Sequence, residues 1–374
     1  MPVIKLLLLI PTLDRSGAEK QFTLLATRLP RDEFAVHAVA LTRTGPYEAV
    51  LRDAGIRLIT LHKRMRVDPI ALWRLKSLIA AEQPDIVHSW IFAANAYVRL
   101  VAGSRPRPKI IVSERCVDSW KSGWQLWLDR RQIGRTTRLV GNSASVAEFY
   151  RGLGVPAEKT AVIPNGVEIP VEPAADRDRA LAEFQIPPGS RVIGFVGRLA
   201  RQKRVHDIIW AMQLLQQLTD RVYLLLVGDG PERKDLIALA RHMGCEHLVR
   251  FAGTRADASR LIGLCNVFWL ASEFEGMSNS IMEAMAAGVP VVASDIPPNR
   301  ELVVNGETGY LVRVGDSVGL AQFTDRILAD ASLAQRLGAA GRERMRANFS
   351  IDRMVAAHAE LYRDVLRDGA APNL

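Results

Sequence analysis

The sequence of 374 residues is poor in cysteine and contains no long hydrophobic segment. Its three cysteines, Cys116, Cys245 and Cys265, are widely spaced and form no metal-ligand pattern. They fit reduced core thiols in a cytoplasmic protein better than disulfides or a zinc site. The longest early apolar run, 3–10, contains a lysine and stops at Pro11. It is far shorter than the roughly 20 residues that span a bilayer, and it lacks the features of a secretory signal. It therefore predicts a buried first strand.

Positive charge is concentrated in the first half of the chain. Residues 1–170 hold 25 Lys and Arg against 15 Asp and Glu, whereas residues 171–374 hold 24 against 25. A basic half can face an anionic membrane or a phosphorylated acceptor, or it can simply be a solvated surface. No aromatic-studded nucleic-acid motif is present, so we expect no nucleic-acid partner.

Short apolar runs rich in β-branched residues alternate with longer segments of helical period. The runs lie at 4–10, 34–40, 57–61, 85–88, 109–113, 138–141 and 160–163, and then at 192–196, 222–227, 248–251, 267–270, 289–293 and 310–312. This alternation predicts parallel sheets covered by helices on both faces. The length suits two domains.

The expected organisation is therefore two doubly wound α/β domains in series. We place the N-terminal domain at 1–170, a linker rich in proline and charge at 171–189, and the C-terminal domain at 190–350. A final helix at 351–366 is expected to pack back onto the first domain. Ligands of open parallel sheets bind beyond the carboxyl ends of the strands, so functional residues should follow strands.

The segment from Glu275 to Glu283 follows the predicted strand at 267–270 and enters a helix near Ser278 or Asn279. Ser and Asn are strong helix N-caps, and a helix N-terminus is suited to a diphosphate. The two glutamates would then accept hydrogen bonds from sugar and ribose hydroxyls on either side of it. The alternative is an ordinary helix-entry loop with two solvated glutamates.

Two basic residues, Arg198 and Lys203, follow the first strand of the second domain. A diphosphate bound at the helix start would need fixed cations or a metal ion to stabilise its charge. The one Asp-x-Asp pattern, Asp176 to Asp178, falls in the predicted linker, so we expect no metal and no cofactor. An Arg-rich surface loop is the alternative for Arg198 and Lys203.

Together these segments resemble the family 4 retaining glycosyltransferases (glycosyl transferases group 1), which have the GT-B fold. The resemblance includes the E-x7-E spacing of Glu275 and Glu283 and covers nearly the whole chain. The similar segments are 164–167, 197–203, 229–231, 251–253, 272–286, 288–293 and 305–312. It implies two Rossmann-like domains facing a central cleft, with a nucleotide diphosphate sugar as the donor. The N-terminal domain would then be the acceptor-side domain and the C-terminal domain the nucleotide-sugar-binding domain.

The resemblance also implies roles for particular residues. Glu283 would hold the donor ribose, and Glu275 would meet the sugar or the diphosphate. Arg198 and Lys203 would replace a metal, which makes Arg198, Lys203 and Glu275 the expected catalytic residues. The remaining donor-binding residues would be Gly17, Gly253, Gly276, Met277, Ser278, Asn279 and Ser280, with Phe251 beside Gly253 near the base. Glu301 is either a cleft-facing acid or a helix-start residue.

In the first domain, Gly17 follows the opening strand and would let the backbone approach the diphosphate. Ser16 stands where the family usually has a second glycine, and a plain strand-to-helix turn is the alternative. His88 follows another strand and would act on the acceptor or donor sugar, or else pack beside Trp90 as a structural residue.

The segment Ser113-Glu114-Arg115 departs from the family, because many members place a histidine near the reacting sugar here. Glu114 would orient the acceptor hydroxyl and Arg115 would bind an acceptor or donor phosphate. A structural ion pair is equally open for both residues.

Trp120, Trp124 and Trp127 recur at helical spacing beside several arginines, including Arg130 and Arg131. They would form an aromatic and basic edge that faces a membrane. The alternative, slightly favoured here, is a core-facing stripe with a solvated basic face.

The expected function is a glycosyltransferase of the hexosyltransferase class. It would move a hexosyl or N-acetylhexosaminyl group from a UDP-sugar to a glycan or lipid-linked acceptor in polysaccharide biosynthesis, with retention. We expect a cytoplasmic enzyme, peripheral at the inner face of the membrane. A nucleotide-sugar epimerase of the same fold and a non-catalytic member that binds glycan phosphate are the alternatives.

Overall fold

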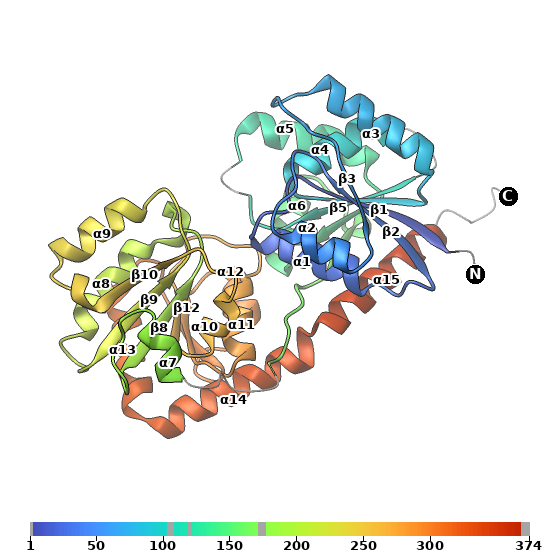
Figure 1. Ribbon diagram of the computed structural model, residues 1–374. Helices are drawn as coiled ribbons and strands as arrows, with labels where there is room; N and C mark the ends of the chain where they lie inside the picture. The colour runs from blue at the N-terminus through green and yellow to red at the C-terminus, as the bar shows by residue number, and fades with distance from the viewer. Residues whose placement is uncertain (1–2, 103–107, 119–120, 171–176, 368–374) are drawn as a thin grey trace. The chain divides into compact units, whose positions relative to one another are not determined.

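The computed structural model describes residues 3–102, 108–118, 121–170 and 177–367 (Figure 1). The chain forms two compact units. The first comprises Met1–Gly166 together with Ile351–Leu374, and the second comprises Val167–Ser350. The chain therefore passes from one unit to the other twice, after Gly166 and after Ser350.

The first unit contains a seven-stranded sheet with the strand order β3-β2-β1-β4-β5-β6-β7. Every neighbouring pair is parallel. Its strands are β1 (Ile4–Ile10), β2 (Phe34–Ala40), β3 (Arg57–Thr60), β4 (Ile86–Trp90), β5 (Lys109–Glu114), β6 (Arg138–Gly141) and β7 (Thr160–Val162). Its helices are α1 (Gly17–Arg28), α2 (Tyr47–Asp53), α3 (Pro69–Glu82), α4 (Ile91–Ala102), α5 (Gly123–Gln132), α6 (Ala144–Gly152) and α15 (Ile351–Arg367).

The central strand β1 is buried on both faces, as the apolar run predicts. Leu6 and Leu8 pack in a core with α1 and α15, whereas Leu7 and Leu9 pack in a separate core with α3, α4 and α6. Alternate residues of a strand point to opposite faces, so the sheet separates the two cores. Helix α15 buries one stripe against the first core, namely Ile351, Met354, Val355, His358, Ala359, Tyr362 and Val365.

The second unit contains a six-stranded parallel sheet with the order β10-β9-β8-β11-β12-β13. Its strands are β8 (Arg191–Val196), β9 (Val222–Val227), β10 (Val249–Gly253), β11 (Val267–Leu270), β12 (Val291–Ser294) and β13 (Gly309–Val312). Its helices are α7 (Arg177–Ala182), α8 (Val205–Leu215), α9 (Arg233–His242), α10 (Ala258–Ile262), α11 (Asn279–Ala286), α12 (Pro297–Leu302), α13 (Ser317–Ala329) and α14 (Ala331–Asn348). The prediction of two doubly wound α/β domains is confirmed.

The predicted linker differs from the structure over its second half. Residues 177–189 belong to the second unit and contain α7, whose Leu181 is fully buried. Arg177 secures this helix because its guanidinium donates to the backbone oxygens of Leu264 and Ser190, at 2.8 and 3.0 Å. The sequence pattern missed this helix because its stabilising contacts are remote in the chain.

Over the described ranges, no helix combines the length and the apolar character needed to cross a membrane.

Candidate active site

Helix α11 begins directly after the loop that follows β11, as predicted. Ser278 is its N-cap, and Oγ of Ser278 accepts a hydrogen bond from the N–H of Ile281 at 3.3 Å. Ser280 Oγ lies 3.1 Å from Ser278 Oγ. Gly276 and Met277, which precede the cap, are buried. The positive end of the helix dipole therefore lies at this loop, where it favours an anionic ligand.

The two glutamates of the segment lie on either side of the helix start. Glu275 is nearly buried in the loop, and its carboxylate forms an ion pair with Nζ of Lys203. Glu283 lies in the second turn of α11 and is half-buried. The structure thus brings Lys203 and Glu275 together, two residues that are 72 positions apart.

Two further hydrogen bonds join the same pair of loops. The side-chain amide of Gln202 donates to the backbone oxygen of Phe274 at 2.7 Å, and the N–H of Glu273 donates to the backbone oxygen of Gln202 at 2.9 Å. With the Lys203–Glu275 ion pair, these contacts attach the basic loop after β8 to the loop before α11. Gln202 is a site residue that the sequence analysis missed, and its place between Arg198 and Lys203 was the available signal.

Arg198 lies on the same basic loop and is exposed. Its side chain makes no hydrogen bond or ion pair with any residue that the structure describes. A cation that no neighbouring carboxylate neutralises is available to an anionic ligand.

The loop after β9 supports the basic loop through backbone contacts that require glycine. Gly228 has φ of 136°, and a Cβ there would lie 1.9 Å from the backbone oxygen of Gly197. A Cβ on Gly230 would lie 2.2 Å from the backbone oxygen of Leu199. The N–H of Leu199 also donates to the backbone oxygen of Asp229 at 3.0 Å. This close approach fixes the position of the loop that carries Arg198.

Phe251 and Gly253, which are predicted to lie near the nucleotide base of the donor, are at the end of β10. Gly253 has φ of 70°, and nothing lies within 4 Å of the position that its Cβ would take. The guanidinium carbon of Arg233 lies 5.9 Å from the ring centroid of Phe251. Nε of Arg233 and Oε2 of Glu232 are buried without a hydrogen-bond partner among the described residues. The sequence analysis missed Arg233, although it closely follows the glycine turn at 229–231.

In the first unit, Gly17 is exposed at the first position of the twelve-residue helix α1. Ser16 is the N-cap, but its hydroxyl donates to the carboxylate of Glu19 and does not cap the helix. Burial raises the pKa of Glu19. The role predicted for Gly17 in binding the diphosphate stays a prediction.

His88 is fully buried, and both of its ring nitrogens have partners. Nδ1 lies 2.7 Å from the hydroxyl of Tyr362, and Nε2 lies 2.8 Å from Oγ of Ser113. Burial, with His358 and Arg115 nearby, holds the pKa of His88 well below its usual value. These contacts favour the packed structural residue over a role on a sugar.

Glu114 is also buried, with 1% of its surface exposed, and belongs to a charged network on the opposite face of the sheet. Its Oε1 accepts a hydrogen bond from Asn95 at 2.9 Å, and its Oε2 lies 3.7 Å from Nζ of Lys121. Lys121 also pairs with Asp118 at 2.8 Å and with Asp129 at 3.0 Å. These contacts favour a structural ion pair for Glu114 over a role in orienting the acceptor hydroxyl.

Arg115, by contrast, forms no ion pair with any described residue. It donates to Oδ1 of Asn165, and its guanidinium carbon lies 4.4 Å from the ring centroid of Trp90. Arg115 therefore differs from His88 and Glu114, because none of the described carboxylates pairs with its charge.

The tryptophans of α5 face outward. Trp124 and Trp127 are 46% and 61% exposed, so the core-facing stripe is wrong for both of them. Helix α5 begins at Gly123, and Trp120 lies outside the described residues.

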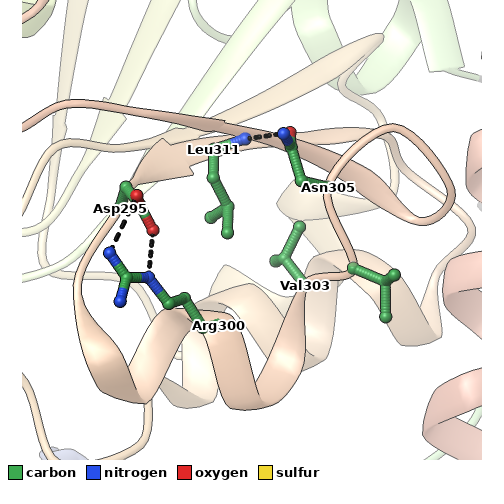
Figure 2. Close-up of a pocket in the computed structure, with 6 residues that line it drawn as sticks. Asp295, Arg300, Val303, Asn305 and Leu311 are labelled. Atoms are coloured by element: carbon green, nitrogen blue, oxygen red, sulfur yellow. Dashed lines mark hydrogen bonds and ion pairs between the residues drawn. The ribbon is translucent and has the colours of Figure 1, made fainter.

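A pocket of about 400 Å³ lies beside α12 (Figure 2). It is lined by Asp295, Arg300, Val303, Val304, Asn305 and Leu311. Its two charged residues pair with each other at 2.6 and 3.0 Å, and no predicted donor residue lines it. Glu301 lies near the end of α12 rather than at a helix start.

Among the described residues, no group of three or more His, Cys, Asp or Glu side chains is placed to hold a metal ion. Asp178 of the Asp-x-Asp pattern lies in α7, and Asp176 lies outside the described residues.

Comparison with protein families gives two adjacent matches. Residues 15–169 match the model described as Glycosyltransferase Family 4, and residues 176–344 match the model described as Glycosyl transferases group 1. The two matches together cover most of both structural units.

Individual proteins agree with these matches. The chain is 28% identical over 347 residues to the lipopolysaccharide core biosynthesis glycosyltransferase LpsE of Rhizobium meliloti, covering 92% of this chain and 95% of that protein. It is 30% identical over 308 residues to glycogen synthase of Mycobacterium tuberculosis, covering 78% and 71%. The crystal structure of Anabaena Alr3699/HepE in complex with UDP-glucose superposes with a TM-score of 0.87 at 23% identity, covering 96% and 100%. The protein is therefore a glycosyltransferase that belongs to family 4 and has the GT-B fold.

Proposed function

We propose that this glycosyltransferase moves a hexosyl or N-acetylhexosaminyl group from a UDP-sugar to a glycan or lipid-linked acceptor in polysaccharide biosynthesis. The transfer would retain the anomeric configuration and require no metal ion.

One observation carries this proposal, namely the attachment of the basic loop after β8 to the loop before α11. The Lys203–Glu275 ion pair and the two hydrogen bonds of Gln202 hold a cation at the N-terminus of a capped helix. Fixed cations and a helix N-terminus are groups that stabilise a departing diphosphate. This arrangement supports nucleotide-sugar chemistry rather than simple glycan binding.

Bond cleavage at the donor leaves negative charge on the diphosphate. Arg198 and Lys203 would receive that charge, and α11 would add the partial positive charge of its start. Glu283 would accept hydrogen bonds from the ribose hydroxyls, while Glu275 holds Lys203 in position. No carboxylate near this loop is proposed as a nucleophile. Catalysis would thus rest on positioning and on stabilising the leaving group.

The choice of UDP and of the acceptor class rests on similar proteins. Anabaena HepE has been crystallised with UDP and with UDP-glucose, and the similar Rhizobium protein acts in lipopolysaccharide core biosynthesis. An epimerase of the same fold would release product without an acceptor. Nucleotide release that requires an acceptor would therefore support the transferase.

The decisive experiment is a thermal-shift screen of UDP-, GDP- and ADP-sugars, followed by a nucleotide-release assay. We expect UDP-sugars to stabilise the protein most. A Glu283→Ala variant should lose affinity for the preferred donor by about tenfold or more, because hydrogen bonds to a carboxylate are lost.

Glu307→Ala is the matched control, since Glu307 is an exposed glutamate of the same unit. If Glu283→Ala binds and turns over the donor as the wild type does, the donor site is wrongly assigned.

An aromatic surface of the first unit favours attachment to an anionic membrane. We define it as the exposed side chains Met65, Val67, Ile70, Trp73, Trp124 and Trp127, which are 46–68% exposed. The guanidinium carbon of Arg66 lies 4.5 Å from the ring centroid of Trp124 and joins the start of α3 to α5. Exposed basic residues accompany it, namely Arg64, Arg66, Arg130 and Arg131. Aromatic side chains beside cations suit a headgroup interface. We therefore propose a cytoplasmic enzyme, peripheral at the inner face of the membrane.

A further inference from the structure

Arg115 lies immediately after β5, at the carboxyl end of the first sheet. Alternate residues of a strand point to opposite faces, so Glu114 and Arg115 separate. Glu114 enters the network of Lys121 on the side of α4 and α5. Arg115 lies on the other side, over the ring of Trp90. The carboxylate next to Arg115 in the sequence therefore does not neutralise it.

The other groups around Arg115 are neutral. Oδ1 of Asn165 accepts a hydrogen bond from Nη2 of Arg115, and the ring of Trp90 lies against the guanidinium. Among the described ionisable groups, His88 and His358 lie near Arg115, and burial lowers the pKa of both. Burial also lowers the pKa of Arg115, to about 9.

Several buried polar atoms beside Arg115 have no hydrogen-bond partner among the described residues. Nη1 of Arg115, Nε1 of Trp90, Nε2 of His358 and Oδ1 of Asn142 are buried without a hydrogen-bond partner among the described residues. The rings of Trp90 and His358 stack at 6.2 Å, and Nδ2 of Asn142 donates to the backbone oxygen of Arg115 at 3.4 Å. Buried polar atoms in native proteins usually have hydrogen-bond partners, so this group of unpaired donors and acceptors is suited to bind a polar ligand.

Two other buried cations of the first unit, Arg99 and Lys121, are paired with a carboxylate. Arg99 and Lys121 are 1% and 5% exposed, and both pair with Asp129, at 2.9 and 3.0 Å. Burying an unpaired charge is costly, which explains this pairing. Arg115 is an exception: the residue is half-buried, its Nη1 is buried, and no described carboxylate pairs with it.

We propose that Arg115 is the centre of an oxyanion-binding subsite that takes a phosphate or carboxylate group of the acceptor. Its position fits, because ligands of parallel sheets bind at the carboxyl ends of strands. The guanidinium offers planar donors that match an oxyanion, and the indole N–H of Trp90 is a second donor beside it. The diphosphate of the donor has Arg198, Lys203 and the start of α11, so Arg115 is assigned to the acceptor. This assignment to the acceptor rests on the proposed function.

The subsite is tested with inorganic phosphate on the full chain. An Arg198→Ala/Lys203→Met background removes the cations proposed for the donor, so phosphate binding there does not contribute. In this background we expect phosphate to raise the melting temperature. Adding Arg115→Gln should weaken the apparent phosphate affinity by about tenfold, Arg115→Lys should restore part of it, and Arg28→Gln should leave it unchanged. Arg28 is an exposed arginine of the same unit.

Without phosphate, Arg115→Gln should unfold at a denaturant concentration no lower than that of its parent, because it removes an uncompensated charge. A lower midpoint together with an unchanged phosphate effect would show that Arg115 is only structural, and would overturn the subsite. So would a phosphate effect that persists in full after Arg115→Gln, or no phosphate effect at all.

Two further measurements in the otherwise wild-type chain identify the source of the oxyanion. We expect Arg115→Gln to leave the affinity for UDP unchanged and to raise KM for a phosphorylated acceptor while KM for the donor stays constant. A tenfold loss of UDP affinity would assign Arg115 to the donor diphosphate and overturn the acceptor subsite. Failure of wild-type protein to bind UDP would instead contradict the proposed function and leave the phosphate result intact.

Discussion

At the scale of single residues, Glu114 and His88 show how strongly the surroundings decide a role. Glu114 ends β5, but His88 lies in the middle of β4 and does not follow a strand as predicted. Both side chains are buried with all their polar atoms engaged. The sequence placed them at the carboxyl edge of the sheet. It did not show that Lys121, just before α5, would pair with Glu114, or that Tyr362 of α15 would hydrogen-bond His88.

The buried carboxyl group of Glu114 gives the first unit a specific pH dependence. Burial, opposed by Lys121, raises the pKa of Glu114 to about 7, above its ordinary 4.5. Between these values the folded state holds a proton that the unfolded chain has released. The folded state is stabilised by this bound proton; the stabilisation is complete below pH 4.5 and is lost as the pH rises through about 7.

A Glu114→Gln variant keeps an uncharged side chain at every pH, so its free energy of unfolding should lose this dependence on pH. We expect the difference in free energy of unfolding between pH 5 and pH 8 to change by an amount on the order of a few kcal/mol. Urea titrations at several pH values measure it. Glu148→Gln, at an exposed position of the same unit, is the control. Identical profiles for Glu114→Gln and the wild type would contradict the prediction.

At the scale of elements, the loops after β8 and β9 act as one support for Arg198. Gly228→Ala should displace the basic loop, because the new Cβ would lie 1.9 Å from the backbone oxygen of Gly197. We expect donor affinity to fall by at least about tenfold, with a loss of stability of about 3 kcal/mol or more from strain and overlap.

Gly244→Ala is the matched control for Gly228→Ala. Gly244 also has positive φ, 69°, but nothing lies within 4 Å of its Cβ position. It should show only the strain of about 1–2 kcal/mol and normal donor affinity by calorimetry. Equal donor affinity in the two variants would show that the loop contact does not support the site.

The strands were the most predictable elements. Each of β1–β13 overlaps a predicted apolar run. The inner strands are apolar on both faces because helices cover both faces of a parallel sheet, whereas the edge strands β3 and β7 are only partly buried. Helix α11 was predictable for a local reason, since Ser278 supplies its own cap. Helix α7 was not, because Arg177 is held by Leu264 and Asn266, which are 87 and 89 positions away in the chain. Gln202 and Arg233 lie within or close to segments that the sequence singles out, but their contacts with Phe274 and Phe251 are seen only in the structure.

At the scale of the whole molecule, positive charge and exposed aromatic side chains coincide on the first unit. Residues 1–170 hold the entire excess of basic residues, and this unit carries the aromatic surface. The charge is evident from the sequence, whereas the spacing of the tryptophans favoured a buried stripe, because helical spacing alone cannot tell a core face from an exposed one.

The aromatic surface should bind vesicles that contain phosphatidylglycerol more strongly than vesicles of phosphatidylcholine alone, and high salt should weaken the binding. Arg130→Glu/Arg131→Glu should lower binding by at least about tenfold, because each basic residue near an anionic surface contributes about 1 kcal/mol. Trp127→Ser should also weaken it. Co-sedimentation at low and high salt measures both effects.

Trp210→Ser is the control, because Trp210 is 47% exposed on the second unit. Absence of binding to anionic vesicles at low salt would contradict the proposal, as would an equal loss for Trp210→Ser and Trp127→Ser.

The path of the chain has a consequence for synthesis on the ribosome. Helix α15 completes the core of the first unit but follows the second unit in the chain. While residues 167–350 emerge from the exit tunnel, Phe34 lacks Tyr362, whose ring centroid lies 5.8 Å away in the folded protein. The second unit can finish folding as soon as it is made. The first unit, although translated earlier, must wait with an apolar flank open, and this flank is where nascent chains would engage a chaperone.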